Sequence, residues 1–309
     1  MAVNDIYKIR LENIAHGGEA LGHIEGKPVF IEGGAPDETV LCRITGENKT
    51  WDRAELLEII EVSPVRIDSA CAFYGKCGGC NLQHIDYNAQ IESKTAILKD
   101  SFARFSRTCP PQPEVFPSSQ WEYRNRMQFH CFRQTAKDSN SPKFGLKGRR
   151  SGEIIAVSDC PIAETGIRKL LQDGGKALPL PPEKDRFTVF SYKELFLSEG
   201  GAQRGKIKLL EKEMTLDAGV FFQSNIVMLE KLILELQKIA AAADTKKPAA
   251  DLYCGAGTFA VFLCEMFPKI VLAEENKKAV SITRENIRAR NIMDRTSEFL
   301  ALKDTEWEK

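Results

Sequence analysis

Apolar and polar residues alternate in short runs along the first 62 residues of the chain. The runs span 6–11, 19–24, 28–31, 39–44 and 54–62, and glycine-rich turns separate them. Alternation with a period of two is typical of strands that are buried on one face. Five such strands in about 60 residues bury a core most easily as a small closed barrel. We therefore predict an N-terminal barrel domain over residues 1–62, of a kind that binds either RNA or another protein.

The spacing of apolar residues changes to that of helices further along the chain. Residues 86–105 carry apolar or small side chains at alternating steps of four and three, which predicts a helix with one apolar face. Residues 228–243 predict a second, strongly amphipathic helix. The residues before it include Gln223, whose amide can donate and accept hydrogen bonds, and Ser224 and Asn225, which are also good helix caps.

The last hundred residues combine a strand, a glycine-rich turn, a helix and a second strand. The turn contains Gly255 and Gly257, which allow the backbone to approach a ligand closely. The strand over 270–274 ends in Glu274, about 20 residues after the glycine-rich turn. In doubly wound sheets an acidic residue at this position contacts the ribose hydroxyls. The pattern lacks the third glycine of dinucleotide-binding folds. We predict a doubly wound α/β domain that binds a nucleoside cofactor.

Composition narrows the class of protein. The chain has 309 residues, 43 basic and 43 acidic side chains, and 43% hydrophobic residues, which suits two or three globular domains. Its apolar runs are shorter than a membrane span and its first residues lack a signal pattern, so we expect a cytoplasmic protein, monomeric and without a membrane partner. The nine cysteines, an odd number, fit a reducing compartment. The balanced charge excludes a generally basic nucleic-acid binder but leaves room for a local basic patch.

Four cysteines have the spacing of metal ligands. Cys71, Cys77 and Cys80 fall within ten residues and are flanked by glycines, and Cys160 precedes a proline. Four thiolates satisfy either a cubane iron–sulfur cluster or tetrahedral zinc. The uneven C-x5-C-x2-C spacing with one distant cysteine favours the cluster over a zinc ribbon. Small buried thiols are the remaining alternative.

A basic segment lies between the cysteines. Two strand-like stretches over 121–133 and 143–150 interleave cations with aromatic rings. Cations suit phosphates and flat rings suit unstacked bases, so this segment predicts contact with RNA, with a solvated strand face as the alternative. The cations concerned are Arg124, Arg126, Arg133, Lys147, Arg149 and Arg150.

Taken in order, these segments resemble a known family of enzymes. Residues 17–22 and 28–31 resemble a TRAM domain, an RNA-binding barrel of the oligonucleotide-binding type. The stretch Asp-x-Tyr-Cys-Gly-x-Gly at 251–257 resembles motif I of class I S-adenosylmethionine-dependent methyltransferases. The whole chain resembles the RNA 5-methyluridine methyltransferases. The resemblance implies a TRAM barrel over 1–62, an α+β iron–sulfur and RNA-binding domain over 63–220, and a partial Rossmann-like methyltransferase domain over 221–309.

The resemblance also implies roles for individual residues. The cofactor S-adenosylmethionine would be bound by Gln223, Tyr253, Gly255, Gly257 and Glu274. The four cysteines named above would ligate a [4Fe-4S] cluster. The helix at 86–105 would pack on the methyltransferase domain. The substrate would be a uridine in tRNA or rRNA.

In this family a cysteine thiolate adds to C6 of uracil, and the resulting enolate at C5 attacks the methyl group. A general base then removes the proton at C5. The family places that cysteine, the base and an Asp-Pro-Pro motif later in the chain, so we expect them beyond Lys309, with Cys254 and Cys264 structural. We then expect the 309-residue chain itself to be inactive toward uridine. A catalytically inactive RNA-binding iron–sulfur protein is the alternative function.

Overall fold

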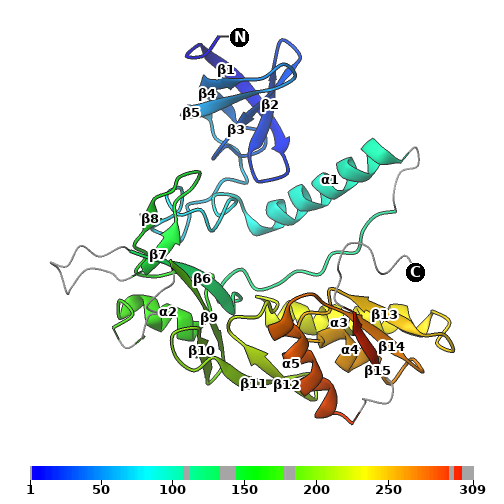
Figure 1. Cartoon of the computed structure of the whole chain (residues 1–309). Coiled ribbons are helices and arrows are strands. Elements are labelled where there is room, and N and C mark those ends of the chain that lie inside the picture. The colour runs from blue at the N-terminus through cyan, green and yellow to red at the C-terminus, as the bar shows by residue number, and fades with distance from the viewer. Residues whose placement is uncertain are drawn as a thin grey trace. The chain divides into compact units, whose positions relative to one another are not determined.

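The computed structural model describes residues 2–106, 111–132, 144–176, 178 and 185–291, and the backbone of 296–300 (Figure 1). The chain forms two compact units. Unit 1 comprises residues 1–117 and 147–155, and unit 2 comprises residues 118–146 and 156–309. We describe each unit by itself.

A closed five-stranded barrel forms most of unit 1. Its strands are β1 (Ile6–Ile14), β2 (Ala20–Ile24), β3 (Lys27–Ile31), β4 (Thr39–Glu47) and β5 (Asp52–Glu61). They follow the order β1-β2-β3-β5-β4, with β4 closing onto β1, and all pairs except β3 with β5 are antiparallel. Buried and exposed residues alternate along much of β1 to β4, and Leu11, Val29, Ile31 and Ile44 are completely buried. The predicted barrel is therefore confirmed.

Unit 1 also contains helix α1 (Tyr87–Phe105) and the short strand β8 (Ile154–Ile155). The helix begins after Asp86, whose carboxylate accepts a hydrogen bond from the Asn88 N–H and caps the first turn. Ala89 and Ile97 pack against the barrel core. The apolar stripe that the sequence shows further along α1 is exposed, most of all at Phe105. Packing of α1 on the methyltransferase domain stays a prediction.

The first half of unit 2 is an antiparallel sheet. It contains β6 (Arg126–Cys131), β7 (Phe144–Lys147, of which the last residue belongs to unit 1), β9 (Arg186–Tyr192) and β10 (Leu195–Ser198), in the order β10-β9-β6-β7. Helix α2 (Thr165–Gln172) packs on β9. Phe129, Phe144 and Phe187 form a buried aromatic cluster, with the last two rings edge to face at 5.2 Å.

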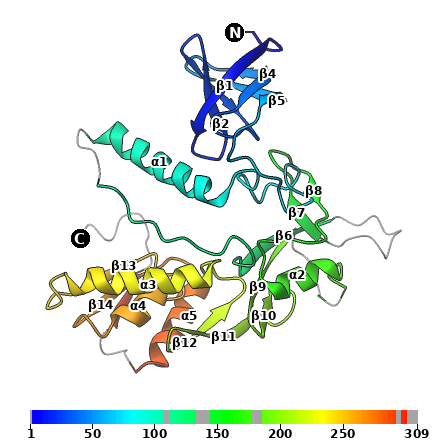
Figure 2. The same ribbon diagram turned by 180° about the vertical axis from the view of Figure 1, so that it is seen from behind.

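The second half of unit 2 alternates helices with parallel strands. Strands β13 (Ala249–Leu252), β14 (Ile270–Ala273) and β15 (Thr296–Leu300) pair in that order. Helices α3 (Ile226–Ala241), α4 (Thr258–Leu263) and α5 (Lys277–Arg288) accompany them, and α3 runs beside α4 (Figure 2). This alternation is typical of a doubly wound α/β fold and confirms the predicted fold of this region.

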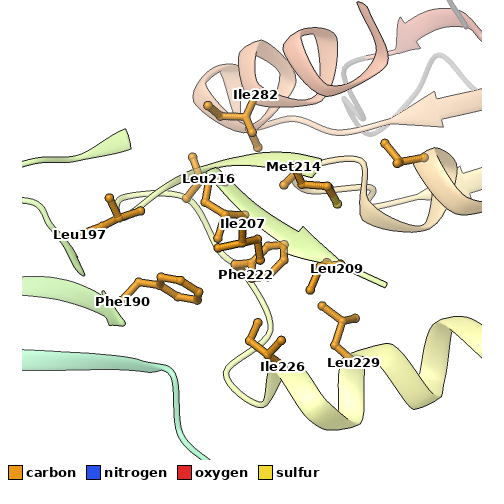
Figure 3. Close-up of a cluster of buried hydrophobic side chains, with 14 of the residues drawn as sticks. Phe190, Leu197, Ile207, Leu209, Met214, Leu216, Phe222, Ile226, Leu229 and Ile282 are labelled. Atoms are coloured by element: carbon orange, nitrogen blue, oxygen red, sulfur yellow. The ribbon is translucent and has the colours of Figure 1, made fainter. Parts of the chain in front are cut away.

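A hairpin of β11 (Arg204–Leu209) and β12 (Lys212–Asp217) packs against these helices. Its apolar face meets α3 through Leu209 and Leu229, and Ile282 of α5 lies over Met214 and Leu216 (Figure 3). The hairpin therefore shares one core with the helices that flank the parallel sheet. Among the described residues, no helix is long and apolar enough to cross a membrane.

Candidate cofactor site

The turn after β13 brings the backbone into a left-handed path. Tyr253, Gly255 and Gly257 have φ values of 60°, 56° and 75°. Glycine is needed at Gly257, because a Cβ there would lie 2.8 Å from the Cγ2 atom of Thr283. The turn ends directly at α4, whose first residue is Thr258. The sequence pattern predicted this strand–turn–helix arrangement correctly.

Glu274 joins the ends of two neighbouring strands. Its Oε2 atom accepts a hydrogen bond of 3.0 Å from the Gly255 N–H, and its Oε1 atom accepts one of 2.8 Å from the Asn276 N–H. The carboxyl ends of β13 and β14 therefore meet at this side chain. Since a carboxylate can accept about four hydrogen bonds, Glu274 keeps capacity for ligand hydroxyls. The structure thus brings together Gly255, Gly257 and Glu274.

Two further predicted residues are exposed. Tyr253 is 75% exposed at the start of the turn. Gln223 is exposed three residues before the first residue of α3. Its neighbour Asn225 caps that helix, because its side-chain oxygen accepts a hydrogen bond of 3.0 Å from the Met228 N–H. The capping interpretation therefore holds for Asn225, and Gln223 remains available to a ligand.

The thiols close to the turn are buried. Cys254 is 7% exposed and packs with Ile270 and Leu272, and Cys264 is 1% exposed. Burial, with the nearby Asp251 carboxylate, raises the pKa of Cys254 to about 12. The Cys254 thiol therefore holds almost no thiolate at neutral pH, and burial keeps the Cys264 thiol from contact with a substrate.

Asp251 begins the motif I stretch but is not among the predicted site residues. Burial raises the pKa of its carboxyl group from about 3.8 to about 6, although the Ala260 N–H donates to it and offsets part of the effect. Its Oδ2 atom finds no hydrogen-bond partner among the described residues. The sequence signal that could have identified Asp251 is a charged residue within the short strand β13.

The four predicted metal ligands are divided between the units. Cys71, Cys77 and Cys80 are half-buried in unit 1, Cys160 is buried in unit 2, and none forms a disulfide. The loop over 71–80 is tied to the last residue of β7, since the Gly78 N–H donates to the Lys147 carbonyl at 2.9 Å. Within the residues described, no three His, Cys, Asp or Glu side chains form a group that could hold a metal ion.

The predicted RNA-binding cations have varied surroundings. Arg149 is paired with Glu32 at 2.6 Å and Arg150 with Glu19 at 2.6 Å, so barrel carboxylates neutralise both. In unit 2, Arg126 lies over the Phe221 ring at 5.8 Å, and burial lowers the pKa of its guanidinium group. Arg124 donates to the Arg126 carbonyl at 3.3 Å, Lys147 is exposed, and Arg133 lies outside the described residues.

Comparisons with known proteins match both units. Residues 2–57 match the TRAM domain, and residues 204–301 match the family described as tRNA (Uracil-5-)-methyltransferase. An uncharacterized RNA methyltransferase of Treponema denticola is 30% identical over 294 residues, which cover 90% of this chain and 70% of the relative. The chain belongs to the tRNA/rRNA uracil-5-methyltransferase family, and it is therefore an enzyme by descent. This confirms the family that the resemblance in the sequence predicted.

Other members of the family extend the comparison. The 23S rRNA (uracil(1939)-C(5))-methyltransferase RlmD of Psychromonas ingrahamii is 26% identical, over 94% of this chain and 75% of the relative. The crystal structure of Pyrococcus abyssi tRNA (uracil-54, C5)-methyltransferase in complex with S-adenosyl-L-homocysteine has 18% identity and a TM-score of 0.68. It covers 94% of this chain and 78% of that protein, and it shows the same fold.

The raised pKa of Asp251 predicts how stability depends on pH. The folded state binds the proton more tightly than the unfolded state does, because the pKa is about 6 against 3.8. The contribution of Asp251 to the free energy of unfolding is therefore greatest below about pH 4 and falls by up to about 3 kcal/mol as the pH rises through 6. We expect Asp251→Asn to remove this fall.

Urea denaturation of both proteins at pH 5 and pH 8 checks this prediction. From pH 5 to pH 8, the free energy of unfolding of Asp251→Asn should rise relative to that of the parent. Asp244→Asn, at an exposed position, should show no such relative rise. An equal pH dependence in parent and Asp251→Asn would contradict the assignment.

Proposed function

We propose that this enzyme transfers a methyl group from S-adenosylmethionine to C5 of a uridine in tRNA or rRNA. The observation that carries the proposal is the hydrogen bond from Gly255 to Glu274 at the carboxyl edge of the parallel sheet. Doubly wound folds bind nucleosides at this edge, with an acidic side chain on the ribose. The reaction is inferred from family membership. The two RNA classes are those in the names of the relatives.

The site residues suit the separate parts of the cofactor. We propose that Glu274 accepts hydrogen bonds from the ribose hydroxyls. The backbone at Gly255 and Gly257 would let the ligand approach closely. The exposed ring of Tyr253 offers a flat apolar surface, and the Gln223 amide offers a donor and an acceptor. Bound there, S-adenosylmethionine would supply an electrophilic methyl group on a sulfonium.

The uracil ring needs activation, since C5 is a poor nucleophile. A thiolate that adds to C6 makes an enolate, and a base then removes the C5 proton so that the thiol can leave. Cys254 and Cys264 are too deeply buried to act as this thiol. We therefore assign neither thiol as the nucleophile.

RNA contact by the basic segment is part of the proposal. Lys147 is exposed and suits a phosphate, and the ring of Phe221 with the Arg126 guanidinium above it suits a flat base. Arg149 is paired with Glu32 and Arg150 with Glu19. A phosphate would therefore have to share each arginine with its carboxylate.

Deletion of the gene from its host tests the function. We expect 5-methyluridine to disappear from one position in either rRNA or tRNA, as measured by nucleoside analysis and mapping of the modified site. Re-expression of the intact gene should restore it. Complementation by Cys254→Ala should also succeed, because this buried thiol is not the nucleophile. Unchanged 5-methyluridine in both RNA classes would refute the proposal.

The ribose assignment predicts the effect of a substitution on cofactor binding. Glu274→Ala removes a charged acceptor for two hydroxyls, so the affinity for S-adenosylhomocysteine should fall about 10- to 100-fold. Isothermal titration calorimetry on the 309-residue chain measures it. Glu275→Ala is the matched control, because Glu275 is the next residue and is exposed. Equal affinities for Glu274→Ala and the parent would show that the ribose lies elsewhere.

We also propose a [4Fe-4S] cluster on Cys71, Cys77, Cys80 and Cys160. The support is their spacing in the sequence and the glycines beside them, which let backbone N–H groups approach the sulfurs. The side chains as described do not converge into a metal-binding group, so the arrangement does not by itself fit the cluster. We therefore assign the cluster no step in the reaction.

Metal analysis checks the cluster. Protein purified without oxygen should be brown and contain about four irons per chain. Cys77→Ala should lose the iron, whereas Cys131→Ala should keep it, because Cys131 is outside the proposed ligand set. Stoichiometric zinc, or no metal at all, would contradict the cluster.

A further inference from the structure

Two buried polar side chains of α5 hold the turn that follows β13. Thr283 is completely buried, and its Oγ1 atom donates a hydrogen bond of 2.6 Å to the Gly255 carbonyl. Asn286 is 2% exposed, and its Nδ2 atom donates one of 2.9 Å to the Ala256 carbonyl. Two consecutive carbonyls of the turn are therefore fixed by side chains one helical turn apart on α5.

Both N–H groups and the oxygen of the Asn286 amide have partners. Its Nδ2 atom also donates to the Thr215 carbonyl at 3.1 Å, and its Oδ1 atom accepts from the Thr215 N–H at 2.7 Å. Leaving such a buried amide without partners would cost free energy, so these contacts specify one arrangement. They connect the turn, α5 and β12 into one hydrogen-bonded group.

The fixed carbonyls also fix the opposite side of each peptide. In a planar trans peptide the N–H points away from the C=O, so a Gly255 carbonyl directed at α5 directs the Ala256 N–H away from it. Thr283 also limits the position of Gly257, since its Cγ2 atom occupies the space that a Cβ would need. The turn is therefore shaped from the α5 side before a ligand arrives.

We infer that Thr283 and Asn286 are positioning residues for the cofactor turn, which they hold in the binding-competent conformation. This inference rests on the proposed cofactor site. A turn that is already ordered loses less conformational entropy on binding, so the loss of one anchor should weaken affinity without removing any group that touches the ligand.

Thr283→Val tests the inference, because valine keeps the shape and lacks the hydroxyl. Thr283→Ser keeps the hydroxyl and serves as the conservative rescue. Ile207→Val, in the buried core of β11, controls for a general loss of stability. The readouts are hydrogen exchange at the Gly255 and Gly257 amides in the unliganded chain, and calorimetry with S-adenosylhomocysteine.

We expect Thr283→Val to speed exchange at both amides about tenfold and to weaken S-adenosylhomocysteine about three- to tenfold. Thr283→Ser should lie within about twofold of the parent in both measurements, and Ile207→Val should lower the melting temperature with the affinity unchanged. Parental exchange rates in Thr283→Val would overturn the inference. If Thr283→Val exchanges faster but the parent does not bind S-adenosylhomocysteine, the positioning role is supported and the proposed cofactor site is contradicted.

Discussion

The hydrogen bond between the Glu274 carboxylate and the Gly255 amide is the contact on which the candidate site depends. It joins the carboxyl ends of β13 and β14, which are adjacent in the sheet, through two residues that are 19 positions apart in sequence. The same carboxylate accepts from the Asn276 N–H, just before α5. One side chain therefore sets the distance between the glycine turn and the start of the next helix. The candidate ligand-binding edge is consequently formed by the sheet and its two connecting turns together.

Unit 1 shows a different use of charge. The protein has equal numbers of acidic and basic residues, and on this unit they meet directly. Arg149 reaches the barrel through Glu32 and the cysteine loop through the Cys80 carbonyl and the Asn81 side chain. An arginine with these partners connects three segments of the chain. Arg149 therefore has a role in the fold, whereas the sequence alone predicts that it contacts RNA.

Local patterns predicted much of the fold. The barrel strands follow from period-two alternation, because their inward residues, such as Leu11 and Ile31, form the core. The turn after β13 follows from two glycines with a left-handed backbone, Gly255 and Gly257, and from an acid at the end of the next strand. These features depend on residues close together in sequence, or on a spacing that the fold class fixes.

Contacts between distant segments could not be predicted in this way. Thr283 and Asn286 look like surface positions of an amphipathic helix, and their partners Gly255 and Thr215 lie 28 and 71 residues away. The pairing of Arg149 with Glu32 joins residues on either side of the cysteine loop. Polar residues in a helical pattern are normally assigned to solvent, and only the tertiary structure shows which of them are buried and satisfied.

The most direct test of the central claim is a crystal structure of the chain with S-adenosylhomocysteine. The account predicts that the ligand lies at the carboxyl ends of β13 and β14, with its ribose hydroxyls on Glu274 and the turn at Gly255 unchanged. A ligand bound elsewhere, or a turn that must rebuild to admit it, would contradict the account.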